Sequence, residues 1–239
     1  MRAGDRAGDR SEVCMKKSQL EFTTIINEAF ASYERRIVAY MAANRDKYEV
    51  FARTIAPNLA SDADIFARIA FAVLSANAPF DDSVKALNVA VKRFAQNKPV
   101  KTEDIIWFKM IPAKAKYLNR LARINLQTLR RLACEDWHEY RMRLKARVLG
   151  LGLTKASFAA CLLYPLEADL ACVDTWIQKV FLGNTGFKSL GIGDYLLVES
   201  KIRTYANCFG VSTFVAQWLI WDHARGSANS HAIFPGSHK

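Results

Sequence analysis

A short glycine turn between two helical segments constrains this chain more than any other feature. Gly150 and Gly152 flank Leu151, and a residue without a side chain lets the backbone turn sharply there. Residues 136–148, before the turn, carry one apolar stripe at helical spacing, with Arg141, Arg143, Lys145 and Arg147 on the other faces. Residues 154–163, after the turn, are apolar on nearly every side. The sequence therefore predicts a helix-hairpin-helix over about 136–164.

The start of the second helix is a candidate site for a phosphate. The first amides of a helix have no partner within it, and the positive end of the helix dipole lies there, so anions bind readily. We assign Gly150, Leu151, Gly152 and Thr154 to contacts with a phosphate on this reasoning. The alternative is a helical hairpin with a glycine-rich turn that binds no ligand.

A single acid follows this hairpin at the start of a further predicted helix, 175–182. Asp174 comes after the apolar segment ADLACV and stands in the sequence Val173-Asp174-Thr175-Trp176. Because aspartate is a favoured N-cap residue, capping this helix is one interpretation of Asp174. The hairpin upstream favours a second interpretation, a catalytic carboxylate.

The hairpin and the acid together resemble the helix-hairpin-helix (HhH-GPD) DNA glycosylase superfamily, whose signature is G-x-G followed about twenty residues later by V-D-T-H or V-D-V-H. Trp176 stands where that family has histidine. The resemblance covers residues 60–182 and is strongest at 150–176. It implies that Asp174 stabilises the positive charge that develops on the sugar as the base leaves. GLGLTKASF is also similar to a divergent, phage-associated branch linked to hypermodified pyrimidines, which its members remove or decorate.

The resemblance also bears on a lysine nucleophile. In bifunctional relatives a lysine two residues after the second glycine attacks C1′ and forms a Schiff base. Thr154 occupies that position here and Lys155 follows it. Lys155 is therefore a candidate nucleophile, with a phosphate-binding cation and a solvated residue as alternatives. Because threonine forms no imine, we expect a monofunctional enzyme that uses water.

Two residues of the first half also match the family. Asn77, in the segment AVLSANA, falls on the glutamine or asparagine that fills the gap in the duplex when a nucleotide is flipped out. Capping or kinking the turn is the alternative for Asn77. Lys114, in the pair Lys114-Ala115, matches a family K-A pair and is assigned to DNA binding. The alternative for Lys114 is a solvated helix face.

Composition and periodicity predict an all-α protein of about ten helices. The 239 residues are 51% hydrophobic, ample for a core, and the formal net charge of +11 favours a polyanionic partner. The resemblance implies a two-lobed glycosylase fold. Its parts are a disordered leader (1–15), a central domain (60–185), a second lobe (16–59 with 186–226) and a tail (227–239). The flipped base would enter between the lobes.

Helix limits follow from caps and breakers. We expect helices over 18–58, 61–76, 83–97, 102–108, 113–124, 126–133, 194–209 and 213–225, with Ser61 and Asp81 or Asp82 as caps. Phe214, Trp218 and Trp221 lie on one side of the last helix and are expected to pack in the core rather than to stack on a base.

The cysteines exclude several classes of protein. Cys14, Cys134, Cys161, Cys172 and Cys208 are odd in number and form no C-x-x-C pair, so we expect neither disulfides nor a zinc site. Only one of them follows Asp174, so the iron–sulfur cluster of some relatives cannot form, and we expect no cofactor and no metal.

Location and assembly are predicted from what the chain lacks. The uncharged run 204–221 is too polar to span a membrane, and the N-terminus has no apolar signal-peptide core. We expect a monomer in the cytoplasm, associated with the nucleoid.

Three functions are consistent with these features. The first is a DNA glycosylase that removes a damaged or modified base, including a phage-type hypermodified one, from double-stranded DNA and leaves an abasic site. The second is a superfamily member that transfers a group onto a modified base. The third is a non-catalytic helix-hairpin-helix protein that only binds DNA.

Overall fold

A computed structural model describes residues 32–105, 111–183 and 190–228. These ranges contain helices, turns and irregular segments and no strand, which confirms the all-α prediction for them. The chain divides into two compact units, 1–43 and 44–239. In the first unit residues 32–43 are helical, and in the second unit residues 44–55 are helical. The predicted leader (1–15) and the first part of the predicted 18–58 helix lie outside the described residues.

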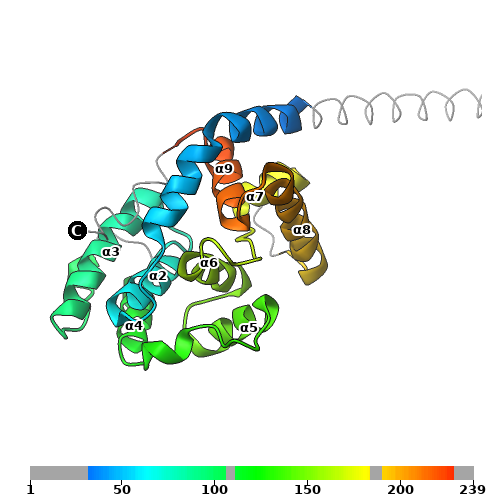
Figure 1. The fold of residues 1–239 in the computed structure, drawn as a ribbon. Coiled ribbons are helices and arrows are strands. Elements are labelled where there is room, and N and C mark those ends of the chain that lie inside the picture. The colour runs from blue at the N-terminus through cyan, green and yellow to red at the C-terminus, as the bar shows by residue number, and fades with distance from the viewer. Residues whose placement is uncertain (1–31, 106–110, 184–189, 229–239) are drawn as a thin grey trace, which may run out of the picture. The chain divides into compact units, whose positions relative to one another are not determined.

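The elements of the second unit follow one another in the order seen in Figure 1. The α-helices after residue 60 are α2 (Asp62–Leu74), α3 (Phe80–Ala95), α4 (Ile111–Leu121), α5 (Trp137–Arg147), α6 (Leu153–Leu163), α7 (Thr175–Leu182), α8 (Ile192–Phe209) and α9 (Thr213–Arg225). Two 3₁₀ turns, η1 (Glu103–Ile105) and η2 (Leu126–Leu129), stand between them. The division into a central domain (60–185) and a second lobe stays a prediction.

Helix α2 lies in the middle of the core. Ser61 caps it as predicted, since its side chain accepts a hydrogen bond from the Asp64 amide at 3.2 Å. Every residue from Ile65 to Leu74 is buried, because α2 packs against α3, α4 and α6. A helix that is buried on all sides is expected to be apolar on all sides, and from Ile65 to Leu74 the one exception is Arg68, whose guanidinium donates to the Ile55 carbonyl at 2.6 Å.

The helix limits differ most from the prediction at the start of α3 and between residues 126 and 133. Helix α3 begins at Phe80 with Pro79 at the N-cap, so Asp81 and Asp82 lie inside its first turn. Carboxylates there stabilise the helix, because they interact favourably with the positive end of its dipole. The predicted helix 126–133 is only the short turn η2, since the backbone is already extended at Arg130.

The predicted hairpin forms as expected. Asp136 and Glu139 make a reciprocal capping box at the start of α5, and α6 begins directly after Gly152. The two helices pack against each other, α5 in green and α6 in olive in Figure 1. Gly150 has a φ of 94°, and a Cβ there would overlap the ring of Tyr117 on α4. Gly150 is therefore required by both its conformation and its neighbour.

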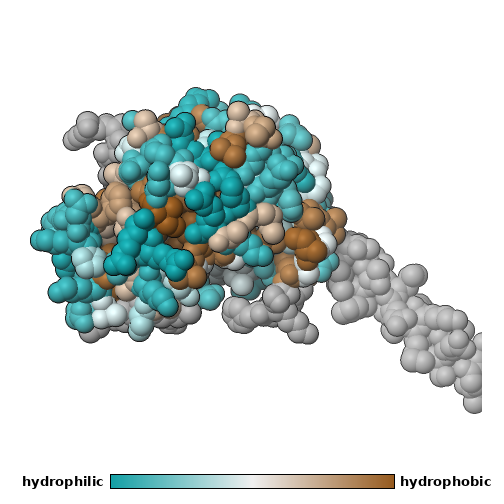
Figure 2. Space-filling view, turned by 90° about the horizontal axis from the view of Figure 1, so that it is seen from below, coloured by the Kyte–Doolittle hydropathy of each residue, from teal (hydrophilic) through white to brown (hydrophobic). Residues whose placement is uncertain are grey.

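The last two helices, α8 and α9, pack on each other. Helix α9 contacts α7 and α8, and each of α8 and α9 ends at a glycine in the left-handed conformation, Gly210 and Gly226. Buried Asp222 on α9 accepts a hydrogen bond from the Tyr48 hydroxyl. On the face drawn in Figure 2, hydrophilic side chains cover most of the described surface, with smaller apolar areas among them. No helix among the described residues is long and apolar enough to cross a membrane.

Candidate active site

A cavity of about 800 Å³ lies in the second unit, between the turn after α2, the start of α6, the residues around Asp174 and helix α9. Asn77, Thr154, Lys155 and Asp174 all line it. Four residues that were singled out from separate parts of the sequence therefore meet at one place. Their individual roles stay predictions.

Asp174 both caps a helix and faces the cavity. Its Oδ1 accepts hydrogen bonds from the amides of Trp176 and Ile177, each at 3.0 Å, which fixes the first turn of α7. Its Oδ2 accepts a hydrogen bond from Nε1 of Trp221 on α9 at 2.8 Å. The side chain also lines the cavity. The capping interpretation is thus confirmed, and it does not exclude the catalytic one.

The residues that lead to the acid, 168–174, form an irregular segment that we call the acid segment. Side chains from α8 and α9 hold its backbone: Glu199 accepts from the Ala171 amide at 2.9 Å, and Tyr195 donates to the Ala171 carbonyl at 2.7 Å. Gln217 accepts from the Cys172 amide at 2.6 Å. Helices that come later in the chain therefore set the position of the acid.

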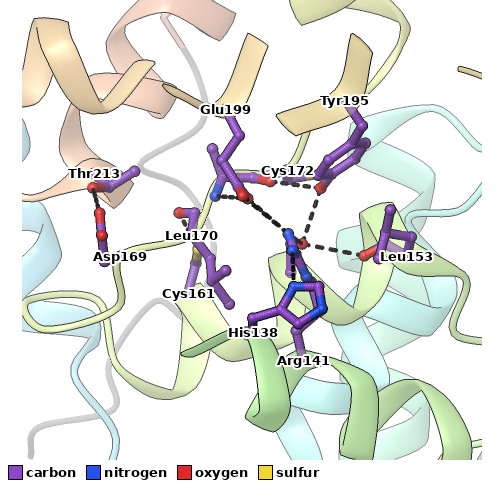
Figure 3. A network of polar contacts seen from close by, with 12 residues as sticks. His138, Arg141, Leu153, Cys161, Asp169, Leu170, Cys172, Tyr195, Glu199 and Thr213 are labelled. Atoms are coloured by element: carbon purple, nitrogen blue, oxygen red, sulfur yellow. Dashed lines mark hydrogen bonds and ion pairs between the residues drawn. The ribbon is translucent and has the colours of Figure 1, made fainter. Parts of the chain in front are cut away.

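A buried ion pair joins this segment to the hairpin. Arg141 on α5 donates to both oxygens of Glu199, at 2.9 and 3.1 Å, and the two side chains are 1% and 2% exposed. Figure 3 shows Arg141 surrounded by Glu199, His138 and Tyr195, and the nearby hydroxyl of Ser157 lies 3.3 Å from its guanidinium. Burial raises the pKa of Glu199 above its ordinary value, and the Ala171 amide and Arg141 oppose this rise. Arg141, expected on the charged outer face of its helix, instead lies in the core.

Lys155 and Thr154 lie in the first turn of α6, at the wall of the cavity. The Lys155 ammonium lies 5.1 Å from the centre of the Phe158 ring, in cation–π geometry. Both residues are half-buried. The three interpretations of Lys155, as nucleophile, phosphate-binding cation or solvated residue, all stay predictions.

Leu151 and Gly152, two of the hairpin residues assigned to DNA, differ in whether they leave room for a phosphate. Leu151 is 6% exposed and its amide donates to the Val148 carbonyl, so neither its side chain nor its N–H is open to a phosphate. Gly152 is exposed, and no atom lies within 4 Å of the position that a Cβ would occupy. Gly152, in contrast, leaves open space over the first turn of α6. The assignments of both residues to DNA contacts stay predictions.

Asn77 lies in an exposed turn, residues 75–78, that we call the Asn77 turn. Its φ is 53°, a left-handed conformation that asparagine tolerates better than most residues. The buried ammonium of Lys114 donates to the carbonyls of Leu74 and Ala76, each at 2.6 Å. Both predictions for Lys114 are therefore wrong: the side chain is 2% exposed, so it neither lies on a solvated face nor reaches DNA. Lys114 braces the Asn77 turn instead.

The cavity has an aromatic side that sequence reasoning missed. Phe80, Phe158 and Trp221 line it, together with Gln217 and Arg225. Phe214 is fully buried, as predicted, whereas Trp221 is half-buried and contacts the acid. The signal in the sequence was Gln217, a polar residue within an otherwise apolar stretch of α9.

The cysteines and other candidate metal ligands do not cluster. Cys134, Cys161, Cys172 and Cys208 are free thiols, and Cys14 lies outside the described residues. Within 32–105, 111–183 and 190–228, no group of three histidine, cysteine or acidic side chains is arranged to bind a metal ion.

Known structures resemble this one closely in fold. The 8-oxoguanine DNA glycosylase of Thermotoga maritima superposes with a TM-score of 0.62 at 21% identity, over 84% of this chain and 98% of that one. The 8-oxoguanine glycosylase/lyase of Methanocaldococcus jannaschii, bound to 15mer DNA containing 8-oxoguanine, superposes with a TM-score of 0.66 at 16% identity, over 80% and 98%. A second structure of the 8-oxoguanine DNA glycosylase from that organism gives 0.55 at 16%, over 87% and 97%.

No protein-family model matches the sequence, and no curated protein matches it significantly. The resemblance to the helix-hairpin-helix glycosylases, inferred from G-x-G and V-D-T, is confirmed at the level of the fold. The chain has the all-α fold of that superfamily.

Proposed function

We propose that this protein is a DNA glycosylase that hydrolyses the N-glycosidic bond of a damaged or modified base and leaves an abasic site. One observation carries the proposal: Asp174, at the expected distance after the hairpin, lines a cavity of about 800 Å³ that also has an aromatic side. A non-catalytic DNA-binding protein would have no use for such a cavity.

The chemistry requires a carboxylate at the sugar. As the bond between C1′ and the base breaks, positive charge develops on the sugar, and a fixed negative charge stabilises that transition state more than the ground state. Asp174 is the acid in this position, and it also orients the water that attacks C1′. The base leaves toward Phe80, Phe158 and Trp221, whose rings are suited to stacking on it.

The DNA backbone binds beside the cavity in this proposal. A phosphate approaches the first turn of α6 at Gly152 and Thr154, where the open space over Gly152 and the helix dipole both favour an anion. Asn77 enters the gap that the flipped nucleotide leaves in the duplex and bonds the orphaned partner base. The net charge of +11 contributes the salt-dependent part of the affinity.

The test is excision from defined duplexes. Because the structural neighbours act on 8-oxoguanine, that base is the first to try, followed by a panel of oxidised, alkylated and phage-type bases. We expect the purified protein to release one class of free base, which mass spectrometry identifies. Asp174→Asn should bind the same duplex yet excise at least about 10³-fold more slowly, since asparagine keeps the helix cap but not the charge. Full activity in this variant would refute the role of Asp174.

Mass spectrometry also separates the group-transfer alternative, because transfer produces a heavier nucleoside and no free base. If no base in the panel is altered and DNA binding is insensitive to base modification, the non-catalytic alternative is supported instead.

We further propose that the enzyme is monofunctional, with water as the nucleophile, because Thr154 occupies the position of the lysine in bifunctional relatives. The specific observation in favour of lyase chemistry is that Lys155 lines the same cavity as Asp174. Borohydride reduces a Schiff base to a stable adduct between protein and DNA. We expect no adduct from the wild-type protein. An adduct that forms with the wild-type protein and disappears in Lys155→Ala would overturn the hypothesis of a monofunctional enzyme.

A further inference from the structure

The carboxylate of Asp174 is held from two sides. Its Oδ1 accepts the two amides at the start of α7, an arrangement that any helix-capping aspartate can make. Its Oδ2 accepts the indole N–H of Trp221, from a different helix and 47 residues later in the chain. The planar carboxylate is therefore held at both oxygens, by the first turn of α7 on one side and by α9 on the other.

Trp221 is itself firmly placed. Its ring lies 5.4 Å from that of Trp218 and 5.7 Å from that of Phe80, measured between centroids, and the guanidinium carbon of Arg225 lies 4.0 Å from its centre. An indole nitrogen can only donate, so the direction of the bond to Asp174 is fixed. A donor to an ionised carboxylate makes a stronger hydrogen bond than a neutral pair does.

We propose that Trp221 is the positioning residue of the active site: its N–H holds Oδ2 of Asp174 and so fixes how the carboxylate faces the sugar of the flipped nucleotide. This inference rests on the glycosylase function proposed above. The carboxylate stabilises the sugar cation only in the correct orientation, so loss of the bond lowers the rate of excision and leaves ground-state DNA binding unchanged. A hydrogen bond to a charged group corresponds to a loss of about 10- to 100-fold.

The experiment uses abasic DNA, so it does not depend on knowing the base. One duplex carries a pyrrolidine ring in place of the sugar, which is protonated near the position of C1′ and mimics the charge of the transition state. A second duplex carries a tetrahydrofuran ring of similar shape without charge. The ratio of the two dissociation constants measures how well the protein stabilises positive charge at the sugar.

We expect wild-type protein to bind the cationic duplex about 100-fold more tightly than the neutral one, and Asp174→Asn to bind both equally. Trp221→Phe should lower this ratio by about tenfold and leave the affinity for the neutral duplex unchanged. The matched control is Trp137→Phe, because Trp137 on α5 does not line the cavity and its ring contacts those of Tyr140 and Tyr164 instead. The same substitution there removes no bond to the acid, so the ratio should change by less than about twofold.

Each outcome decides something. A wild-type ratio in Trp221→Phe overturns the positioning role while leaving the glycosylase proposal intact. A wild-type protein with no preference for the cationic duplex overturns the glycosylase proposal and the positioning role with it. If Trp221→Phe does not fold, benzothienylalanine at position 221, in which sulfur replaces the indole N–H, keeps the ring volume and gives the same test.

Discussion

The two sides of the cavity are held in different ways. On one side the acid segment takes its position from Glu199, Tyr195, Gln217 and Trp221, four side chains on two helices distant in sequence. On the other side the Asn77 turn stays exposed, and the bonds from Lys114 to the adjoining carbonyls brace it. In the proposed function the first side meets the bond that breaks and the second meets the gap in the duplex. The comparison indicates that long-range contacts are concentrated where atomic position decides the rate.

The largest effect on stability is expected from breaking the buried ion pair that supports the acid segment. Glu199→Leu leaves the Arg141 guanidinium buried without its carboxylate and removes the acceptor of the Ala171 amide. We expect the free energy of unfolding in urea to fall by about 3–5 kcal/mol. Replacing both partners, Arg141→Met with Glu199→Leu, should restore much of that loss. A loss below about 1 kcal/mol in the single variant would contradict the idea that this side is rigidly held.

A smaller effect is expected in how stability depends on pH through Lys114, which braces the Asn77 turn. Burial lowers the pKa of Lys114 from 10.5 to about 8, with a contribution from nearby Lys155. Between these two values the unfolded chain binds more protons than the folded one, so stability rises with pH through this window. The wild-type protein should gain about 2 kcal/mol between pH 8 and 10 relative to Lys114→Met. Chemical unfolding of both proteins at several pH values measures the difference, and a constant difference would show that Lys114 is not penalised by burial.

The smallest effect concerns the backbone of the Asn77 turn. Because Asn77 has a φ of 53°, alanine there is strained, whereas glycine is not. We expect Asn77→Ala to destabilise the protein by about 1 kcal/mol, and Asn77→Gly to leave the melting temperature nearly unchanged. Both variants lose the amide and should lose excision equally. Unequal excision would indicate that the shape of the turn, rather than the amide, serves the reaction.

Local sequence signals predicted the hairpin and the acid well. The G-L-G turn and the N-cap at Asp174 each depend on residues within a few positions of one another. The same reasoning failed for Lys114 and Arg141, since a charged residue on a predicted helix is ordinarily solvated. Their partners are a pair of backbone carbonyls and a glutamate on α8, and no helical periodicity reveals either.

The contacts that complete the site could not be predicted from the sequence for a related reason. Trp221 lies 47 residues after Asp174, and Gln217 lies 45 residues after Cys172. Which residue of α9 faces the acid depends on how α7, α8 and α9 pack together, and this packing is a property of the whole core. The sequence therefore predicted the acid but not the side chains that hold it.

Cys172, two residues before Asp174, can report chemically on access to the active site. Cys172 is 4% exposed, and burial raises the pKa of its thiol to about 12, so the reactive thiolate is scarce at neutral pH. Alkylating reagents should modify the exposed Cys134 and Cys208 first, and Cys172 far more slowly. Because Cys172 also lines the cavity, the rate at which it is labelled reports access to the active site, and DNA bound in the cavity should slow that rate.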